Sequence, residues 1–214
     1  MSASHPFPGY LIAIEGIDGA GKSTLADLVQ ALLTARKFRV VRSKEPTTGR
    51  WGRMLRDSAL TGRLSLEEEV ETFIKDRMEH VERLIIPALL EGKVVLLDRY
   101  YFSTVAYQGA RGMDPAELMR RNETFAPEPD LLVLVDVDPQ LGLERVRSRG
   151  NHADQFEKTG TLEKAREIFN RIQKPYLLRL DGTLQPQALL ELIALRFLAV
   201  LEERDTTHRA DWKN

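Results

Sequence analysis

Residues 16–23 read Gly-Ile-Asp-Gly-Ala-Gly-Lys-Ser and fit the pattern Gly-x-x-x-x-Gly-Lys-Ser/Thr. Residues 10–15 before them have the composition of a strand, and residues 23–36 after them carry apolar side chains at helical spacing. A glycine-rich turn between a strand and a helix points backbone N–H groups at one spot, where the helix dipole also favours an anion. A turn that only connects two elements is the alternative, but the fixed residues and both flanks favour a site for a nucleoside triphosphate.

The side chains of this loop have separate tasks in such a site. Lys22 would reach the β- and γ-phosphates, and the hydroxyl of Ser23 would bind the magnesium ion that accompanies them. The loop therefore predicts binding of a nucleotide, but it does not identify what the nucleotide is used for.

Composition bounds the other classes of function. A chain of 214 residues with 43% hydrophobic and 29% charged residues suits one globular α/β domain. The net charge of −1 gives no sign of a nucleic-acid surface or of attraction to an acidic membrane. The absence of cysteine excludes disulfides and thiolate chemistry and agrees with a cytoplasmic location. We see no signal peptide at the start and no apolar run near the roughly 18 residues that would span a bilayer.

Strand and helix patterns alternate along the chain. Residues 94–97 and 131–135 are unbroken apolar runs, which are typical of strands covered on both faces in a parallel sheet. Five strands are predicted, at 10–15, 38–43, 93–97, 130–136 and 176–180. Helices are predicted at 23–36, about 50–60, 66–91, 115–122, 139–148, 161–174 and 186–203. This alternation predicts a doubly wound sheet, which binds its ligands beyond the carboxyl ends of its strands.

One segment at such a strand end carries adjacent opposite charges. Asp98 and Arg99 directly follow the apolar run 94–97, and burying either charge alone would be costly. In a phosphate site Asp98 can hold magnesium or its water, and Arg99 can bind phosphate through two hydrogen bonds. The alternative is an Asp–Arg pair that only closes the strand, and the phosphate loop makes the site the better interpretation.

Two further segments have both a functional and a purely structural interpretation. Arg145, Arg147 and Arg149 alternate at a helix end, which suits a loop that folds over phosphates but also a solvated basic stretch. Phe73 and Arg77 lie four residues apart, so one helix face could stack a base and bind its edge. A core Phe beside a surface Arg is the simpler interpretation of that pair taken alone.

Together these segments resemble the thymidylate kinase family, P-loop kinases that convert dTMP to dTDP with ATP in dTTP biosynthesis. The resemblance runs from about Tyr10 to Glu203, and its most specific part is residues 98–100 followed by 103–104 and 106–109. It implies the α/β fold of P-loop nucleoside monophosphate kinases, with a five-stranded parallel sheet and a short lid at about 147–160. Residues 1–214 would form a single domain with loose tails at about 1–8 and 204–214, and relatives are usually homodimers joined by long helices.

The resemblance assigns the nucleoside part of dTMP to residues of two segments, one in the predicted helix at 66–91 and one after the strand at 93–97. Phe73 would stack on thymine and Arg77 would reach its O4 atom. Thr104 and Gln108 would contact the pyrimidine edge. Tyr107 would lie under the sugar and leave no room for a 2′-hydroxyl.

The resemblance also indicates which residues would bind the sugar and the acceptor phosphate of dTMP. Asp18 would meet the 3′-hydroxyl, and Arg99 would bind the acceptor phosphate, near Arg56. Glu45 and Pro46 would form the turn after the second strand, with a cis peptide bond before Pro46. The implied substrate-binding residues are Asp18, Glu45, Pro46, Arg56, Phe73, Arg77, Arg99, Ser103, Thr104, Tyr107 and Gln108.

The resemblance assigns the binding of ATP and Mg²⁺ to the phosphate loop and the lid. The implied ATP-binding residues are Gly16, Ile17, Asp18, Gly19, Ala20, Gly21, Lys22, Ser23, Thr24, Arg145 and Arg147. The implied metal ligands are Ser23 and Asp98, and the implied catalytic residues are Lys22, Asp98, Arg99 and Arg149. The loop after the last strand, at 181–183, would lie on the adenine side.

Thymidylate kinases carry a catalytic arginine either in the phosphate loop or in the lid. Position 19 is glycine here, so the chain is similar to the bacterial lid-arginine type, with Arg149 as the first choice for the transition-state contact. Two other functions stay open at this stage. One is a kinase for another nucleotide or for a deoxynucleoside, which Arg77 and Gln108 would distinguish, and the other is a nucleotide-binding module without transfer activity.

Overall fold

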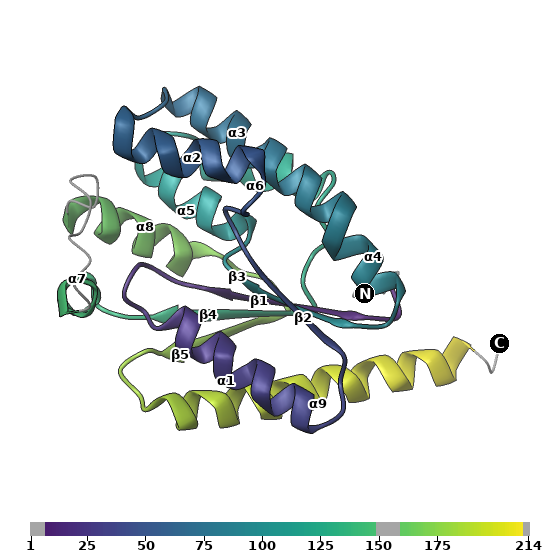
Figure 1. The fold of residues 1–214 in the computed structure, drawn as a ribbon. Helices are drawn as coiled ribbons and strands as arrows, with labels where there is room; N and C mark the ends of the chain where they lie inside the picture. The colour runs from purple at the N-terminus through teal and green to yellow at the C-terminus, as the bar shows by residue number, and fades with distance from the viewer. Residues whose placement is uncertain (1–6, 149–158, 212–214) are drawn as a thin grey trace.

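The computed structural model describes residues 7–148 and 159–211. Five parallel strands form one sheet in the order β2-β3-β1-β4-β5 (Figure 1). They are β1 (Tyr10–Glu15), β2 (Val40–Lys44), β3 (Val94–Asp98), β4 (Leu131–Asp136) and β5 (Leu177–Asp181). Each begins or ends within two residues of its predicted place, and the predicted α/β fold with a five-stranded parallel sheet is confirmed.

Helices cover both faces of this sheet. Helices α1 and α9 lie together on one side, and the others gather mostly on the opposite side (Figure 1). The α-helices are α1 (Lys22–Ala35), α2 (Arg50–Thr61), α3 (Leu66–His80), α4 (Ile86–Leu90), α5 (Tyr101–Ala110), α6 (Pro115–Glu123), α7 (Pro139–Ser148), α8 (Thr159–Arg171) and α9 (Pro186–Asp211). Every residue of β3 and all but the last of β4 are buried, as their unbroken apolar runs predict.

The predicted helix at 66–91 forms as three joined pieces. It starts at a capping box, in which the Ser65 hydroxyl accepts from the Glu68 N–H while the Glu68 carboxylate accepts from the Ser65 N–H. A π-helical turn at Val81–Ile85, labelled η1, then separates α3 from α4. The apolar spacing of the segment does not reveal this change of winding, because the turn keeps the chain on the same axis.

Two expectations about chain organisation need correction. The structure has a further helix, α5, directly after β3, which the sequence patterns do not predict. Helix α9 continues to Asp211. The expectation of a loose tail from residue 204 onward is therefore wrong for Arg204. The Arg204 guanidinium donates to the carbonyls of Phe7 and Gly9 and to the Asp130 carboxylate, which fastens α9 to the start of β1.

Residues 1–6, 149–158 and 212–214, which include most of the expected lid and parts of both expected tails, lie outside the described residues. In the described part of the chain, no helix is both long enough and apolar enough to cross a membrane.

We expect Arg204→Ala to lower the free energy of unfolding by about 2 kcal/mol, because three acceptors lose a charged donor. Arg196→Ala is the matched control on the same helix, since Arg196 pairs with the exposed Glu203, and it should cost less than about 1 kcal/mol. Urea unfolding measures both variants. Equal losses would show that Arg204 does not fasten α9.

Candidate active site

The phosphate loop lies between β1 and α1, as predicted. The side chain of Lys22, the first residue of α1, is buried, and its ammonium donates to the carbonyls of Gly16 (3.0 Å) and Ile17 (2.8 Å). Burial lowers the pKa of Lys22 to about 8, and the positive charge of Arg99 acts in the same direction. The loop therefore holds a poorly solvated cation, which a polyanionic ligand would stabilise.

Gly19 brings the loop into backbone contact with α7. Its φ angle is 79°, and a Cβ atom there would lie 2.0 Å from the carbonyl oxygen of Gly142. From the other side, a Cβ atom on Gly142 would lie 2.5 Å from the carbonyl oxygen of Asp18. No larger residue fits at position 19 while α7 stays where it is, so this packing excludes an arginine at that position.

Ser23 and Asp98 face each other across the ends of α1 and β3. The Ser23 hydroxyl donates to Asp98 Oδ2 at 2.5 Å, and the exposed Lys44 ammonium lies 3.8 Å from the same oxygen. Asp98 Oδ1 is buried without a hydrogen-bond partner. A hydroxyl and an unpaired carboxylate oxygen are ligands that suit Mg²⁺. The described residues hold no cluster of three or more acidic, His or Cys side chains, so this pair fits a metal ion that takes its other ligands from phosphates and water.

Arg99 joins the segment after β3 to the phosphate loop. One guanidinium nitrogen donates to Asp18 Oδ1 and the other to Ser103 Oγ, at 3.1 Å. The Tyr107 hydroxyl donates to Asp18 Oδ2 and accepts from the Asp18 N–H, both at 3.0 Å. Burial lowers the pKa of Arg99, but Asp18, Tyr107 and Glu15 together outweigh burial and the net pKa is raised. Asp18, Arg99, Ser103 and Tyr107 thus form one cluster, as the resemblance implies.

The turn after β2 contains the cis peptide bond expected between Glu45 and Pro46. It is held from α3, where the Asp76 carboxylate accepts from the N–H and the hydroxyl of Thr47 at 2.7 and 2.6 Å. Arg56 lies at the turn but donates to the carbonyls of Pro46 and Thr47, at 3.0 and 2.7 Å. The structure therefore shows Arg56 supporting the turn.

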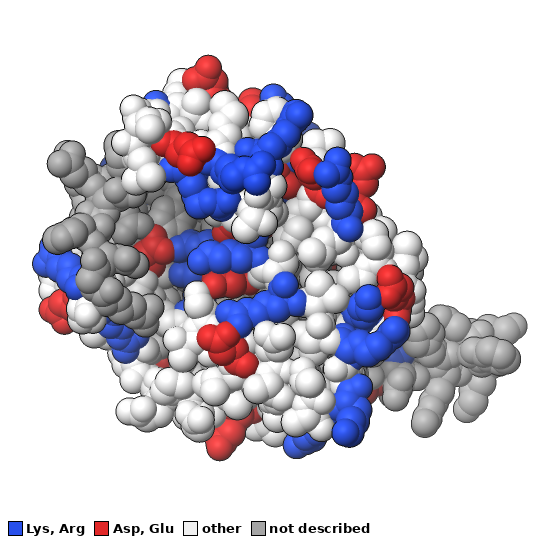
Figure 2. All heavy atoms as spheres, in the orientation of Figure 1, with Lys and Arg blue, Asp and Glu red and all other residues white. Residues whose placement is uncertain are grey.

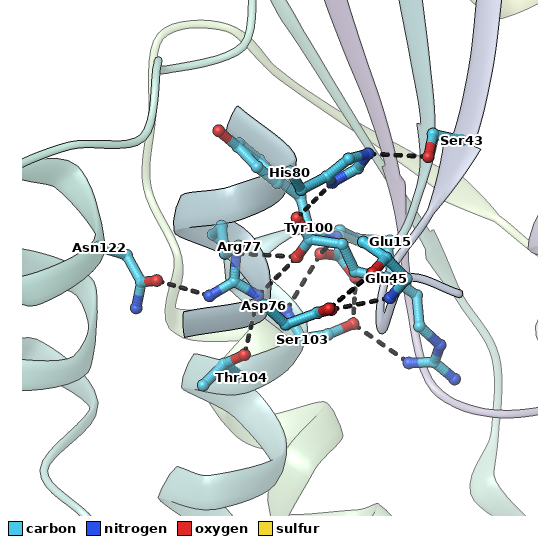
Figure 3. Close-up of polar contacts among 12 residues, drawn as sticks. Glu15, Ser43, Glu45, Asp76, Arg77, His80, Tyr100, Ser103, Thr104 and Asn122 are labelled. Carbon is cyan, nitrogen blue, oxygen red and sulfur yellow. Dashed lines mark hydrogen bonds and ion pairs between the residues drawn. The ribbon is translucent and has the colours of Figure 1, made fainter. Parts of the chain in front are cut away.

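A buried network surrounds Arg77 (Figure 3). Its guanidinium donates to Glu45 Oε2 at 2.8 Å, to Asn122 Oδ1 at 2.5 Å and to Thr104 Oγ1 at 3.1 Å. His80 contacts the other oxygen of Glu45 at 3.0 Å. Burial raises the pKa of Glu45, but the charges and hydrogen bonds of Arg77 and His80 together outweigh it and the net pKa is lowered. The Arg77 plane is thereby fixed.

The side chains expected around the base lie on α3 and α5, beside this network. Phe73 is half-buried one turn before Arg77, and among the described residues it belongs to neither apolar cluster. Gln108 is buried, and its Oε1 atom has no hydrogen-bond partner. A half-buried aromatic ring and an unpaired amide oxygen suit a planar ligand with polar edges.

The structure describes two of the three arginines that are expected at the lid. Arg145 donates to the Gly182 carbonyl at 3.1 Å, which ties α7 to the loop expected on the adenine side. Arg147 is exposed near the end of α7. Arg149 lies outside the described residues. On the face shown in Figure 2, Lys and Arg side chains gather between α1 and α2, which is where anionic ligands of the phosphate loop would enter.

Sequence reasoning missed several polar residues that complete the site. Glu15, His80 and Asn122 are all buried and hydrogen-bonded to residues of the site. Burial raises the pKa of Glu15 to about 7, while its hydrogen bond from Ser103 and the charge of Arg99 oppose that rise. A charged residue at the end of an apolar strand was the available signal for Glu15, the same signal that identified Asp98.

Gly142→Ala tests the contact between the loop and α7. The new Cβ atom would press on the carbonyl of Asp18, so we expect the free energy of unfolding to fall by about 1–3 kcal/mol and the Kd for ATP to rise. Gly160→Ala on α8 is the matched control, because nothing lies within 4 Å of its Cβ position. Urea unfolding and ATP titration read out both variants, and an unchanged Gly142→Ala protein would contradict the close packing.

Comparisons with known proteins agree with this geometry. A family model described as thymidylate kinase matches residues 14–193. The chain is 52% identical over 182 residues to a thymidylate kinase of Akkermansia muciniphila, which covers 85% of this chain and 88% of that one. It is 50% identical over 196 residues to thymidylate kinases of Xanthomonas euvesicatoria and Xanthomonas campestris, which covers 92% of this chain and 86% of each relative. With these matches on top of the shared fold, the chain belongs to the thymidylate kinase family.

Proposed function

We propose that this protein transfers the γ-phosphoryl group of ATP to dTMP, giving dTDP and ADP. One observation carries the proposal: Asp18, a residue of the phosphate loop, is bound by Arg99 and Tyr107 of the segment after β3. The loop expected to bind ATP and the arginine expected to bind the acceptor phosphate, Arg99, therefore contact each other through the Asp18 carboxylate. The thymidylate kinase relatives support the choice of nucleotide.

The base would be identified by the fixed guanidinium of Arg77. Of its five N–H groups, those on Nε and Nη2 are directed to Glu45 and Thr104, and Nη1 has one bond to Asn122. The second N–H of Nη1 is left for an acceptor such as a carbonyl oxygen of thymine. Phe73, one turn away, would stack on the ring, and Thr104 and Gln108 would contact its edge.

The reaction asks for little covalent chemistry from the protein. The acceptor is a phosphate that is already anionic at neutral pH, so no strong general base is needed. Positioning by Arg99 and charge neutralisation by Lys22 and the lid arginines would supply most of the acceleration. Mg²⁺ held by Ser23 and Asp98 would neutralise charge on the donor phosphates. Glu45, a carboxylate in the turn after β2, is occupied by Arg77 and His80, which disfavours its use as a base toward a nucleoside hydroxyl.

The remaining expectations belong to the same proposal. The catalytic arginine would come from the lid, because position 19 of the loop is glycine and packs directly against Gly142. A homodimer formed through the long helical segment is supported by Met78 and Leu90, which are exposed apolar residues on α3 and α4. A cytoplasmic location fits both the nucleotide substrates and the cysteine-free sequence.

A substrate panel tests the proposed acceptor. With ATP and Mg²⁺ in excess, we expect kcat/KM for dTMP to exceed that for dCMP, dGMP or AMP by about 100-fold, because a wrong base leaves buried donors unpaired. A coupled ADP assay measures all four acceptors. Comparable values for dTMP and any of the others would refute the assignment, and ATP binding without transfer to any acceptor would favour a non-catalytic module.

Single substitutions in the lid test the source of the catalytic arginine. We expect Arg149→Ala to lower kcat about 10²–10³-fold with little change in the KM for dTMP, as for loss of one donor to the transition state. Arg147→Ala is the matched control and should have a smaller effect. An unchanged kcat for Arg149→Ala would move the role to Arg145 or Arg147, or out of the lid.

A further inference from the structure

Glu15 ends β1 directly before Gly16, and its carboxylate is fully buried. It accepts three hydrogen bonds, all from the segment that follows β3 (Figure 3). Oε1 accepts from the N–H groups of Tyr100 and Ser103, at 2.7 and 3.0 Å, and Oε2 accepts from the Ser103 hydroxyl at 2.6 Å. One side chain of the phosphate-loop strand therefore holds the first residues of the segment that carries Arg99.

These contacts hold the backbone on both sides of Arg99. The φ angle of Arg99 is 73°, a left-handed conformation that is costly for a residue with a side chain. On one side the Arg99 N–H donates to the Ile14 carbonyl at 3.0 Å, and on the other side the Tyr100 N–H donates to Glu15. The end of β1 thus compensates for a conformation that a free chain would leave.

The same carboxylate also fixes the Arg99 side chain through Ser103. An arginine can only donate hydrogen bonds, so the Ser103 oxygen must accept from Arg99 and must send its own proton elsewhere. Glu15 Oε2 takes that proton. The direction of the Ser103 hydroxyl, and with it the place of the guanidinium, therefore depends on an acceptor at position 15.

We propose that Glu15 is a positioning residue for the acceptor side of the site. It sets both the backbone and the guanidinium of Arg99, and it ties the cation for the acceptor phosphate to the loop that holds the donor. The inference rests on the proposed function, because it takes Arg99 to bind the phosphate of dTMP.

Two substitutions test the two halves of this arrangement. Ser103→Ala removes the hydroxyl that bridges the Arg99 guanidinium and Glu15 Oε2, and it leaves the backbone N–H of residue 103 bonded to Glu15 Oε1. Glu15→Gln places an amide NH₂ where Oε2 now accepts, so the Ser103 hydroxyl would lose the acceptor for its proton. We expect kcat/KM for dTMP to fall about 10-fold in Ser103→Ala and about 100-fold in Glu15→Gln, the range for lost hydrogen bonds to charged groups. The KM for ATP should stay close to that of the unchanged protein.

A double-mutant cycle with Arg99→Ala separates positioning from general stabilisation. If Glu15 acts through Arg99, Glu15→Gln should add little to the loss already caused by Arg99→Ala. A residue that only stabilises the fold would give additive losses. Ser103→Thr is the matched control, because it keeps the hydroxyl and should retain most of the activity that Ser103→Ala loses.

The outcomes are distinguishable. If the unchanged protein does not phosphorylate dTMP, the proposed function fails. If it does, and Glu15→Gln and Ser103→Ala keep its kcat/KM or combine additively with Arg99→Ala, the role of Glu15 is overturned. Should Glu15→Gln not fold, as judged by its thermal melting, the Ser103→Ala and Arg99→Ala cycle decides alone.

Discussion

Parallel pairing of β1 with β3 places Ile14 opposite Asp98, so these two central strands end side by side. The phosphate loop follows one strand and the Asp98–Ser103 segment follows the other, which makes their ion pairs and hydrogen bonds unavoidable. Ser23 meets Asp98, Asp18 meets Arg99, and Glu15 meets Ser103 across this junction. The register of one strand pair thus decides where a donor nucleotide, a metal ion and an acceptor phosphate can lie relative to one another.

Charged side chains in and beside this junction are deeply buried. Glu15, Asp98 and Arg77 are at most 2% exposed, and Glu45 is 3% exposed. Buried ion pairs seldom add net stability, because each charge loses its hydration. Here the buried ion pairs fix the orientation of two guanidinium groups. Arg77 and Arg99 are each held by several acceptors, so their remaining N–H donors have fixed orientations. Such fixed donors bind and orient a substrate without reorganising when it arrives.

The sequence was sufficient for the parts of this structure that depend on local pattern. Strand-like patterns located all five strands, with unbroken apolar runs at 94–97 and 131–135, and the charges directly after the first run identified Asp98 and Arg99. It was insufficient where partners are distant, since Glu15 and Tyr100 lie 85 residues apart and Arg77 and Asn122 lie 45 apart. Helix α5 was missed because its aromatic and β-branched residues are weak helix formers, and packing on α8 decides its conformation. The residues expected to contact dTMP came from the family resemblance. The structure adds which of these side chains are held in place by hydrogen bonds.

A crystal structure of the protein with dTMP tests most directly whether this junction joins donor and acceptor. The geometry predicts thymine stacked on Phe73 with its O4 atom at the guanidinium of Arg77, and the phosphate bound by Arg99 beside the phosphate loop. A nucleotide bound elsewhere, or bound with its phosphate away from an Arg99 that keeps its pairing to Asp18, would contradict the proposed site.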